Sequence, residues 1–383
     1  MVEIIKKLSP YLKEVWNHLH AHPELSFEEY ETTSYIESLV KQYTCKVMTF
    51  DDSTGLVVEI GSGSPVVALR ADIDALWQEV DGEFKANHSC GHDAHMTIAI
   101  GVLLTLLEGG LPEKGTFRFI FQPGEEKGTG ALSFVEKGVV DDVDFLYGMH
   151  LRPIEELKNG QFAPAIQHGA AKFIKGKIRG DDAHGARPHL NANAIQVGME
   201  LYQHMSNIQV NPRISHSAKL TAFHAGAKSA NIIPGNATFS IDLRAETNDV
   251  IELLTKKIEQ ITSMLASYHQ VKIELEVGAN VAAALLDDDA VHMMEEAIRK
   301  SVGEENVAPV ITTTGGDDFH FYTIKRPKLK ATMLAIGCDL KPGLHHPHMT
   351  FNHAIIPKAV EILVNALKET AKNYSGKGEK QHG

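Results

Sequence analysis

Apolar residues recur along this chain at two spacings, and the alternation between the spacings predicts its helices and strands. Ile4, Leu8, Leu12 and Val15 recur at helical spacing, which predicts an amphipathic helix over residues 3–20. Short apolar runs bounded by turn residues predict strands instead. By these criteria we expect strands at 56–60, 66–69, 116–121, 145–149 and 329–336, and further helices at 92–107, 130–137, 288–302 and 355–372.

A capping box predicts where the second helix begins. Ser26 and Glu29 stand three residues apart, which is the spacing at which their side chains cap the first amides of a helix. We therefore expect a helix over 27–42, entered through the corner formed by His22 and Pro23.

The central part of the chain predicts a second domain of different character. Its elements follow the order strand, helix, strand, strand, helix, strand, which is the ferredoxin-like pattern. These elements are expected at 172–179, 193–208, 219–225, 237–244, 249–267 and 271–277. Strands alternate with helices elsewhere, so we predict an α/β fold with a mixed sheet sandwiched by helices. The catalytic domain would comprise residues 1–168 and 281–383, and residues 169–280 would form an inserted ferredoxin-like α+β lid domain.

Composition narrows the class of protein. A length of 383 residues fits two domains, and 43% hydrophobic with 22% charged residues is typical of soluble globular proteins. A net charge of -12 argues against nucleic acid or an anionic membrane as a partner. The three cysteines give no disulfide framework, the N-terminus lacks an apolar signal core, and the longest apolar run is too short to span a bilayer. We therefore expect a cytoplasmic protein. Residues 374–383 are polar and rich in Gly and Lys, and are expected to be disordered.

Residues 88–95, His-Ser-Cys-Gly-His-Asp-Ala-His, concentrate metal-binding chemistry at the start of a predicted helix. Cys90 and His92, on either side of Gly91, make a compact chelate for a borderline-soft divalent ion. The alternative is a helix start capped by polar residues, in which Cys90 is a small buried apolar side chain.

Three strand ends in succession carry an acid or an imidazole. Asp72 and Asp74 follow the strand 66–69, Glu125 and Glu126 follow the strand 116–121, and His150 follows the strand at 145–149. Open α/β sheets bind ligands outside the carboxyl ends of their strands. Of two adjacent carboxylates, one can ligate a metal while the other takes a proton from water. Each pair alone also fits a solvated loop, but their recurrence at one edge favours a site.

The inserted domain carries His184 in the segment 182–189. A histidine there fits a plain surface loop. It also fits a residue that swings over the main-domain site and donates to a developing oxyanion.

Together these motifs resemble the amidohydrolase branch of the zinc aminopeptidase/aminoacylase superfamily, which includes hippurate hydrolases, N-acyl-amino-acid deacylases and auxin-conjugate hydrolases. The similarity extends from His22 to His345, nearly the whole chain. The segments that carry it are 70–76, 90–95, 122–126, 148–151, His184 with 188–189, 231–234 and 344–345.

The resemblance implies hydrolysis of the amide bond of N-acyl-amino acids or similar small amides, with two divalent ions, zinc or manganese. The implied metal ligands are Cys90, His92, Glu126, His150 and His345. Glu125 is the implied general base, His184 the implied oxyanion donor, and Asp93 a carboxylate that orients a ligand imidazole. Asn231 and Arg244 are expected to contact the substrate. Inserted domains of this shape often pair through their sheet edges in relatives, which fits a homodimer.

Two other readings stay open. One is a dipeptidase or aminopeptidase with the same dinuclear centre, and the other is a metal-binding relative without catalysis. The chain departs from the branch at Trp77, Arg152, Asp317 and Asn352-His353. None of these positions is an implied ligand or the implied base, so they leave open the acyl and amino-acid groups rather than the chemistry.

Overall fold

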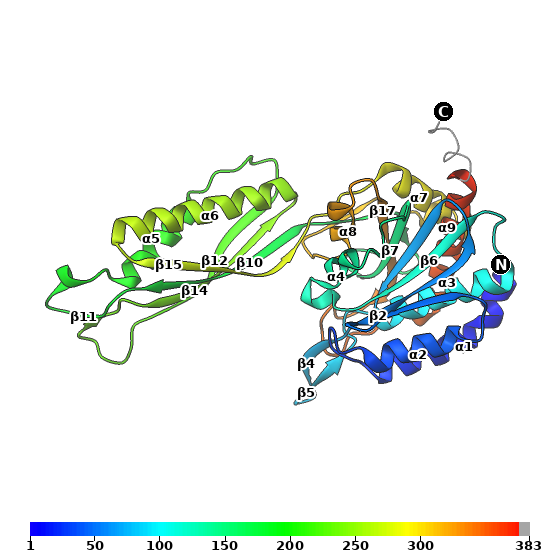
Figure 1. Cartoon of the computed structure of the whole chain (residues 1–383), viewed down its shortest axis with the longest axis horizontal. Coiled ribbons are helices and arrows are strands. Elements are labelled where there is room, and N and C mark those ends of the chain that lie inside the picture. The colour runs from blue at the N-terminus through cyan, green and yellow to red at the C-terminus, as the bar shows by residue number, and fades with distance from the viewer. Residues whose placement is uncertain (375–383) are drawn as a thin grey trace. The chain divides into compact units, whose positions relative to one another are not determined.

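The structure is a computed structural model, and it describes residues 1–374 (Figure 1). It divides into two compact units. Unit 1 comprises Met1–Gln167, Leu285–Thr312 and the chain from Asp318 onward, and unit 2 comprises His168–Ala284 and Thr313–Asp317. The predicted insertion, 169–280, falls within unit 2. The predicted disorder of 374–383 lies outside the described residues, apart from Tyr374.

A mixed sheet forms the centre of unit 1. Among the described residues it has seven strands in the order β1-β2-β6-β3-β7-β17-β8. Strands β6, β3, β7 and β17 run parallel to one another, whereas β1, β2 and β8 pair antiparallel to their neighbours. The strands are β1 (Lys46–Phe50), β2 (Ser53–Ser62), β3 (Val66–Asp72), β6 (Gly115–Gln122), β7 (Phe145–Pro153), β8 (Phe162–Ala163) and β17 (Lys330–Leu340).

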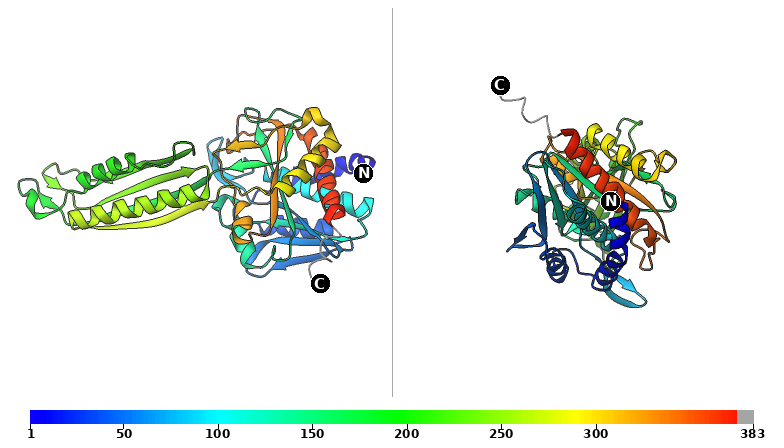
Figure 2. Two further views of the ribbon diagram at one scale, coloured as in Figure 1. Left: turned by 90° about the horizontal axis from the view of Figure 1, so that it is seen from above. Right: turned by 90° about the vertical axis from the view of Figure 1, so that its right-hand side faces the viewer.

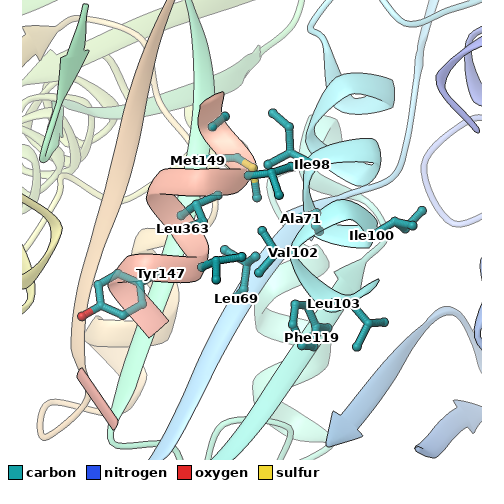
Figure 3. Close-up of a cluster of buried hydrophobic side chains, with 14 of the residues drawn as sticks. Leu69, Ala71, Ile98, Ile100, Val102, Leu103, Phe119, Tyr147, Met149 and Leu363 are labelled. Carbon is teal, nitrogen blue, oxygen red and sulfur yellow. The ribbon is translucent and has the colours of Figure 1, made fainter. Parts of the chain in front are cut away.

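Helices pack on this sheet through a dry apolar core. Ile98 and Val102 of α3 and Leu363 of α9 gather with Leu69 of β3 and Tyr147 of β7, and all five are fully buried (Figure 3). Helix α3 is buried from His92 to Leu106, and beyond its polar first turn its side chains are almost all apolar, as is typical of a helix enclosed on every side. Helix α7 lies beside α9 (Figure 2). The helices of unit 1 are α1 (Val2–Ala21), α2 (Tyr30–Val40), α3 (His92–Gly109), α4 (Gly130–Glu136), α7 (Asp288–Val302), α8 (His320–Lys325) and α9 (Ile356–Tyr374). No helix in the described part of the chain combines the length and apolar character needed to cross a membrane.

Unit 2 is a four-stranded antiparallel sheet, ordered β12-β14-β10-β15, with α5 and α6 along one face (Figures 1 and 2). Burial alternates along β10, so that Ile174 and Ile178 enter the core beneath the helices while Lys175 and Lys177 face solvent. Its main elements are β10 (Ala170–Arg179), α5 (Ala194–Ser206), β12 (His216–Ala225), β14 (Ala237–Ala245), α6 (Asn248–His269) and β15 (Lys272–Val281). The predicted ferredoxin-like order, and with it the predicted α/β fold class, is confirmed.

The sequence pattern did not predict β1, β8 and a set of further short elements. They include a β4–β5 hairpin, whose residues are mostly polar or exposed and so lack a buried apolar period. These elements are β4 (Leu76–Val80), β5 (Glu83–Asn87), β9 (Ile166–His168), β11 (Ala183–His184), β13 (Ile232–Ile233), β16 (Ile311–Thr313) and the one-turn helices η1 (Glu125–Lys127), η2 (Pro188–Leu190), η3 (Glu304–Asn306) and η4 (His353–Ile355).

The predicted capping box is wrong. Helix α2 begins at Tyr30, and its first amides are capped by Glu24, whose carboxylate accepts from the amides of Glu31 and Thr32 at 3.1 and 2.7 Å. Ser26 and Glu29 are both buried and turn away from the helix. Their hydrogen bonds go to residues distant in sequence, which local spacing cannot reveal.

Candidate metal centre

A glycine lets Cys90 and His92 meet at the start of α3. Gly91 has a φ of +89°, in the left-handed region, and a Cβ atom there would lie 2.9 Å from Cδ1 of Leu151. Helix α3 therefore begins directly at His92, and Cys90 and His92 are both almost fully buried.

The five predicted metal ligands lie together in unit 1, as two overlapping groups of three. Ligand atoms of Cys90, His92 and His150 are all within 4.8 Å of one another, and so are those of Cys90, Glu126 and His345. Sγ of Cys90 is 3.6 Å from Nε2 of His150, and Oε1 of Glu126 is 3.6 Å from Nε2 of His345. Bonds of about 2.0–2.3 Å in a tetrahedral site place ligand atoms roughly 3.3–3.8 Å apart. The spacing fits two neighbouring divalent ions, and Cys90 belongs to both groups.

Two buried atoms of this cluster lack hydrogen bonds. Nε2 of His92 and Oε1 of Glu126 have no hydrogen-bond partner among the described residues, and such atoms are costly to bury. Burial raises the pKa of Glu126 to about 7 and raises the pKa of the Cys90 thiol well above its usual range. Cations held between these groups would satisfy the orphaned atoms and favour the anionic forms. The residues therefore fit a pair of divalent ions.

Both buried ligand imidazoles are oriented by a backbone carbonyl. Nδ1 of His92 donates to the carbonyl oxygen of Asp74 at 2.9 Å, and Nδ1 of His150 donates to that of Leu151 at 2.7 Å. The Asp74 carboxylate also lies 3.3 Å from Nδ1 of His92. These contacts leave Nε2 of each ring free to bind metal, which is the usual role of groups behind a metal-bound histidine.

The predicted orienting role of Asp93 is wrong. Its carboxylate pairs with Nδ1 of His20 in α1 at 2.7 Å, and its other oxygen accepts the amide of Ala94. Consecutive side chains on a helix do not face each other, so a carboxylate next to His92 in sequence points away from that ring.

A third imidazole, His95, has a role that the sequence did not reveal. The amide of Leu151 donates to Nε2 of His95 at 3.1 Å, so the proton is on Nδ1, which donates to Asp72 at 2.7 Å. His95 thus ties α3 to β3 and β7 directly beneath the cluster. The strand-end position of Asp72 and Asp74 was the available signal, but it did not say which histidine each would hold.

Glu125 lies at the rim of the cluster, in the η1 turn that follows β6. One of its carboxylate oxygens is 3.9 Å from Nε2 of His92, and the other accepts the amide of Asp318 at 3.4 Å. Its side chain is about one-tenth exposed, like that of Glu126, whereas Cys90, His92 and His150 are buried. This position suits a carboxylate that receives a proton beside bound metal.

His345 reaches the cluster from an exposed loop that is held at its backbone. Its amide donates to the carbonyl of Ser89 at 2.8 Å, and the side-chain amide of Gln78 donates to the carbonyl of His345 at 3.0 Å. The β4–β5 hairpin therefore supports this ligand.

The remaining predicted site residues belong to unit 2. His184 and Asn231 are exposed neighbours, because β11 pairs with β13 and the amide of Gly185 donates to the Asn231 carbonyl at 2.7 Å. Arg244 lies near the end of β14, roughly 23 Å along the strand from its first residue Ala237, and its guanidinium donates to Asp242 and to the Thr314 carbonyl. The predicted substrate contacts of Asn231 and Arg244 stay predictions.

Known proteins share this architecture over nearly the whole chain. N-acetyl-L-cysteine deacetylase of Bacillus subtilis (strain 168) is 29% identical over 382 residues, which cover 95% of this chain and 89% of the relative. IAA-amino acid hydrolase ILR1-like 4 of Arabidopsis thaliana is 30% identical over 363 residues, covering 88% and 81%. A solved Bacillus subtilis structure, described as a dinuclear metal binding peptidase from the M20 family, matches with a TM-score of 0.80 at 24% identity and covers 96% of this chain and 99% of that one.

The resemblance read from the motifs is confirmed by a family model. That model, Peptidase family M20/M25/M40, matches residues 68–369, which include every predicted ligand and the predicted base. This protein is a member of peptidase family M20/M25/M40.

Proposed function

We propose that this protein hydrolyses the amide bond of N-acyl-amino acids or similar small amides, with Glu125 as general base. The observation that carries the proposal is the pair of ligand groups that share Cys90, with a further carboxylate 3.9 Å from a ligand nitrogen. Relatives named as an N-acetyl-L-cysteine deacetylase and an IAA-amino acid hydrolase support amide hydrolysis of small substrates.

The residues of the proposed site have different chemical roles. Two divalent ions, when bound, would polarise the amide carbonyl and lower the pKa of a nearby water. Cys90, His92, Glu126, His150 and His345 would hold these ions. Glu125 takes a proton from the attacking water and passes it to the leaving nitrogen, so one carboxylate serves first as base and then as acid. We assign to His184 a hydrogen bond to the oxyanion that develops on the carbonyl.

We infer the metal and the cellular compartment from the cysteines. A thiolate in both ligand groups favours zinc, while manganese is the alternative that metal supply can impose. Cys45, Cys90 and Cys338 are free thiols in the structure, which supports a reducing compartment and so the cytoplasm.

The aminopeptidase or dipeptidase reading differs in the group that the pocket must hold. A free amine requires an acidic anchor, whereas an acyl group requires an apolar one. Comparing N-acetyl- and N-benzoyl-amino acids with dipeptides separates the two readings, and a protein that binds metal but cleaves neither class would be a non-catalytic relative.

A pairing surface on unit 2 supports a homodimer. Strand β12 is an edge of its sheet, and α5 lies beside it. Ile195, Met199 and Tyr202 recur on one face of α5 and are 42%, 68% and 60% exposed. We propose that this edge and helix face bind the same surface of a second copy, because an isologous contact buries both at once.

Replacing the base should abolish turnover without removing the metal. For Glu125→Gln we expect kcat to fall by about 10²- to 10⁴-fold, because the amide cannot accept the proton, with metal content unchanged. The measurement is steady-state kinetics on an N-acetyl-amino acid, with Glu136→Gln, an exposed acid, as control. Wild-type turnover in Glu125→Gln would remove this residue from its role.

Ligand substitutions should separate the two ions. Because Cys90 belongs to both groups, Cys90→Ala should lower the bound metal from two ions to less than one, whereas His150→Ala and His345→Ala should each lose one ion. Metal analysis after dialysis checks this. Chelation of the wild type should lower its Tm, since a ligand at about 1,000 times its Kd contributes about 4 kcal/mol of stability. Equal metal loss in all three variants would contradict two separate ions.

His184→Ala tests the oxyanion donor. We expect kcat to fall by about 10²- to 10³-fold, the usual effect of removing one such donor, while two ions remain bound. His189→Ala, an exposed histidine of the same segment, is the matched control. If both variants behave alike, His184 is a surface residue.

Charge placed on the proposed pairing surface should separate the subunits. Sedimentation of the wild type should give twice the mass of one chain, and Met199→Glu with Tyr202→Glu should give one chain, because a buried unpaired carboxylate is costly. Tyr268→Glu, at an exposed position on α6, is the control. A wild type with the mass of one chain rules the dimer out.

A further inference from the structure

Glu29 is a buried acid that the proposed mechanism does not use. Its side chain is 0% exposed, and its two carboxylate oxygens accept from the hydroxyl of Thr54 and from the amide of Gly124 at 3.0 Å. Gly124 directly precedes Glu125. Glu29 therefore holds the backbone on one side of the proposed base.

Ser26 reaches the other side of the same turn through Asp74. Its hydroxyl donates to Oδ2 of Asp74 at 2.6 Å, and the same oxygen accepts the amide of Glu126 at 3.0 Å. The ammonium of Lys127 in turn donates to the carbonyl of Ser26 at 2.9 Å. Glu125 thus lies between two backbone amides that are both anchored by the 26–29 segment.

Phe27 adds a packing contact to the same turn. A Cβ atom built on Gly124 would lie 2.5 Å from the Phe27 ring, so the ring lies directly against the backbone of the turn. Gly124 has a φ of +70° and needs to be glycine both for its conformation and for this close approach. We call Ser26, Phe27 and Glu29 the 26–29 clamp.

We propose that the 26–29 clamp positions the Glu125 carboxylate for proton transfer, with Glu29 as its principal positioning residue. The inference rests on the proposed function, because it concerns the same base. It gives a role beside the base to Ser26 and Glu29, whose spacing in the sequence resembles a capping box. A misplacement of about 1 Å in a catalytic group can lower a rate by as much as about 10²-fold, so a clamp on the adjacent amides has a measurable effect.

The charge of Glu29 supplies a signature that a purely structural contact lacks. Burial raises its pKa to about 7, and the negative charge of Asp74 adds to this, while the Thr54 hydroxyl opposes it. Asp74 is the titratable side chain that faces the carboxylate, and the Thr54 hydroxyl and the backbone amides of Gly124, Phe27 and Glu29 supply neutral contacts. Because the folded pKa lies above the ordinary value of 4.5, stability from this group is lost as pH rises through about 7.

Three variants separate positioning from folding. Glu29→Gln keeps an oxygen that can accept the Gly124 amide, Glu29→Met removes it at similar length, and Glu28→Gln is the exposed neighbour and matched control. On the metal-loaded protein we expect Glu29→Met to lower kcat by about 10- to 100-fold at unchanged KM and metal content, Glu29→Gln to lower it by less than about fivefold, and Glu28→Gln to have no effect.

Two readouts do not depend on activity. Hydrogen exchange of the metal-free and metal-loaded proteins should show faster exchange in the peptide that contains Gly124 for Glu29→Met than for the wild type. The Tm of metal-free Glu29→Gln should rise above that of the wild type as pH is raised from about 5 to about 8, because the variant carries no charge to bury. Slower turnover in a variant of higher Tm cannot result from unfolding.

The possible outcomes distinguish failure of the positioning role from failure of the proposed function. The inference is overturned if Glu29→Met keeps wild-type kcat, if its activity falls only in proportion to lost metal, or if exchange around Gly124 is unchanged. If the wild type cleaves no amide, the proposed function fails, and the exchange experiment still decides whether Glu29 holds the turn. Should Glu29→Met not fold, Phe27→Leu, which removes the ring packed on Gly124, is judged by the same kcat and exchange criteria.

Discussion

The buried guanidinium of Arg70 sets the geometry on which the candidate centre depends. It is 1% exposed and donates to Asp72, Asp318 and Gln122 at 2.6, 2.7 and 2.9 Å, so a charge that is costly to bury is matched from three separate segments. Asp72 in turn accepts a hydrogen bond from His95, and Nε2 of His95 accepts the amide of Leu151, the residue after His150. The ends of β3, β6 and β7 are thereby fixed relative to the start of α3, and the predicted ligands are carried on this rigid base.

Much of the fold could be predicted from local pattern, because burial imposes a period on the sequence. The long buried helix from His92, the strands β2, β3, β6, β7 and β17 of the central sheet and the ferredoxin-like order of unit 2 all follow from that period, whereas the edge strands β1 and β8 were not predicted. The β4–β5 hairpin could not, since its large aromatic residues Trp77 and Phe84 are exposed and Val80 is its one buried position. The predicted start of α2 was wrong because the first amides of the helix donate to the Glu24 carboxylate and not to Ser26.

For the candidate centre, the motifs named the side chains but not their partners. Cys90, His92, Glu126, His150 and His345 lie together as the motifs imply. Glu126 follows β6 and His92 begins α3, whereas His150 lies within β7, which continues to Pro153 beyond the strand end predicted at 149. What orients them depends on contacts between residues far apart in the chain. Asp93 was expected to orient a ligand imidazole, yet it pairs with His20, and the carbonyl of Asp74 from another segment holds His92. Such pairings are decided by tertiary packing, which a single sequence does not display.

The two units have separate hydrophobic cores, and every predicted metal ligand lies in unit 1. Unit 2 contributes His184, Asn231 and Arg244, none of which belongs to the ligand groups. Ion binding and the proposed substrate contacts are thus encoded in different stretches of the gene product. On the proposed assignment, substitutions within 168–284 at positions other than His184 change substrate recognition and leave the predicted metal ligands unchanged.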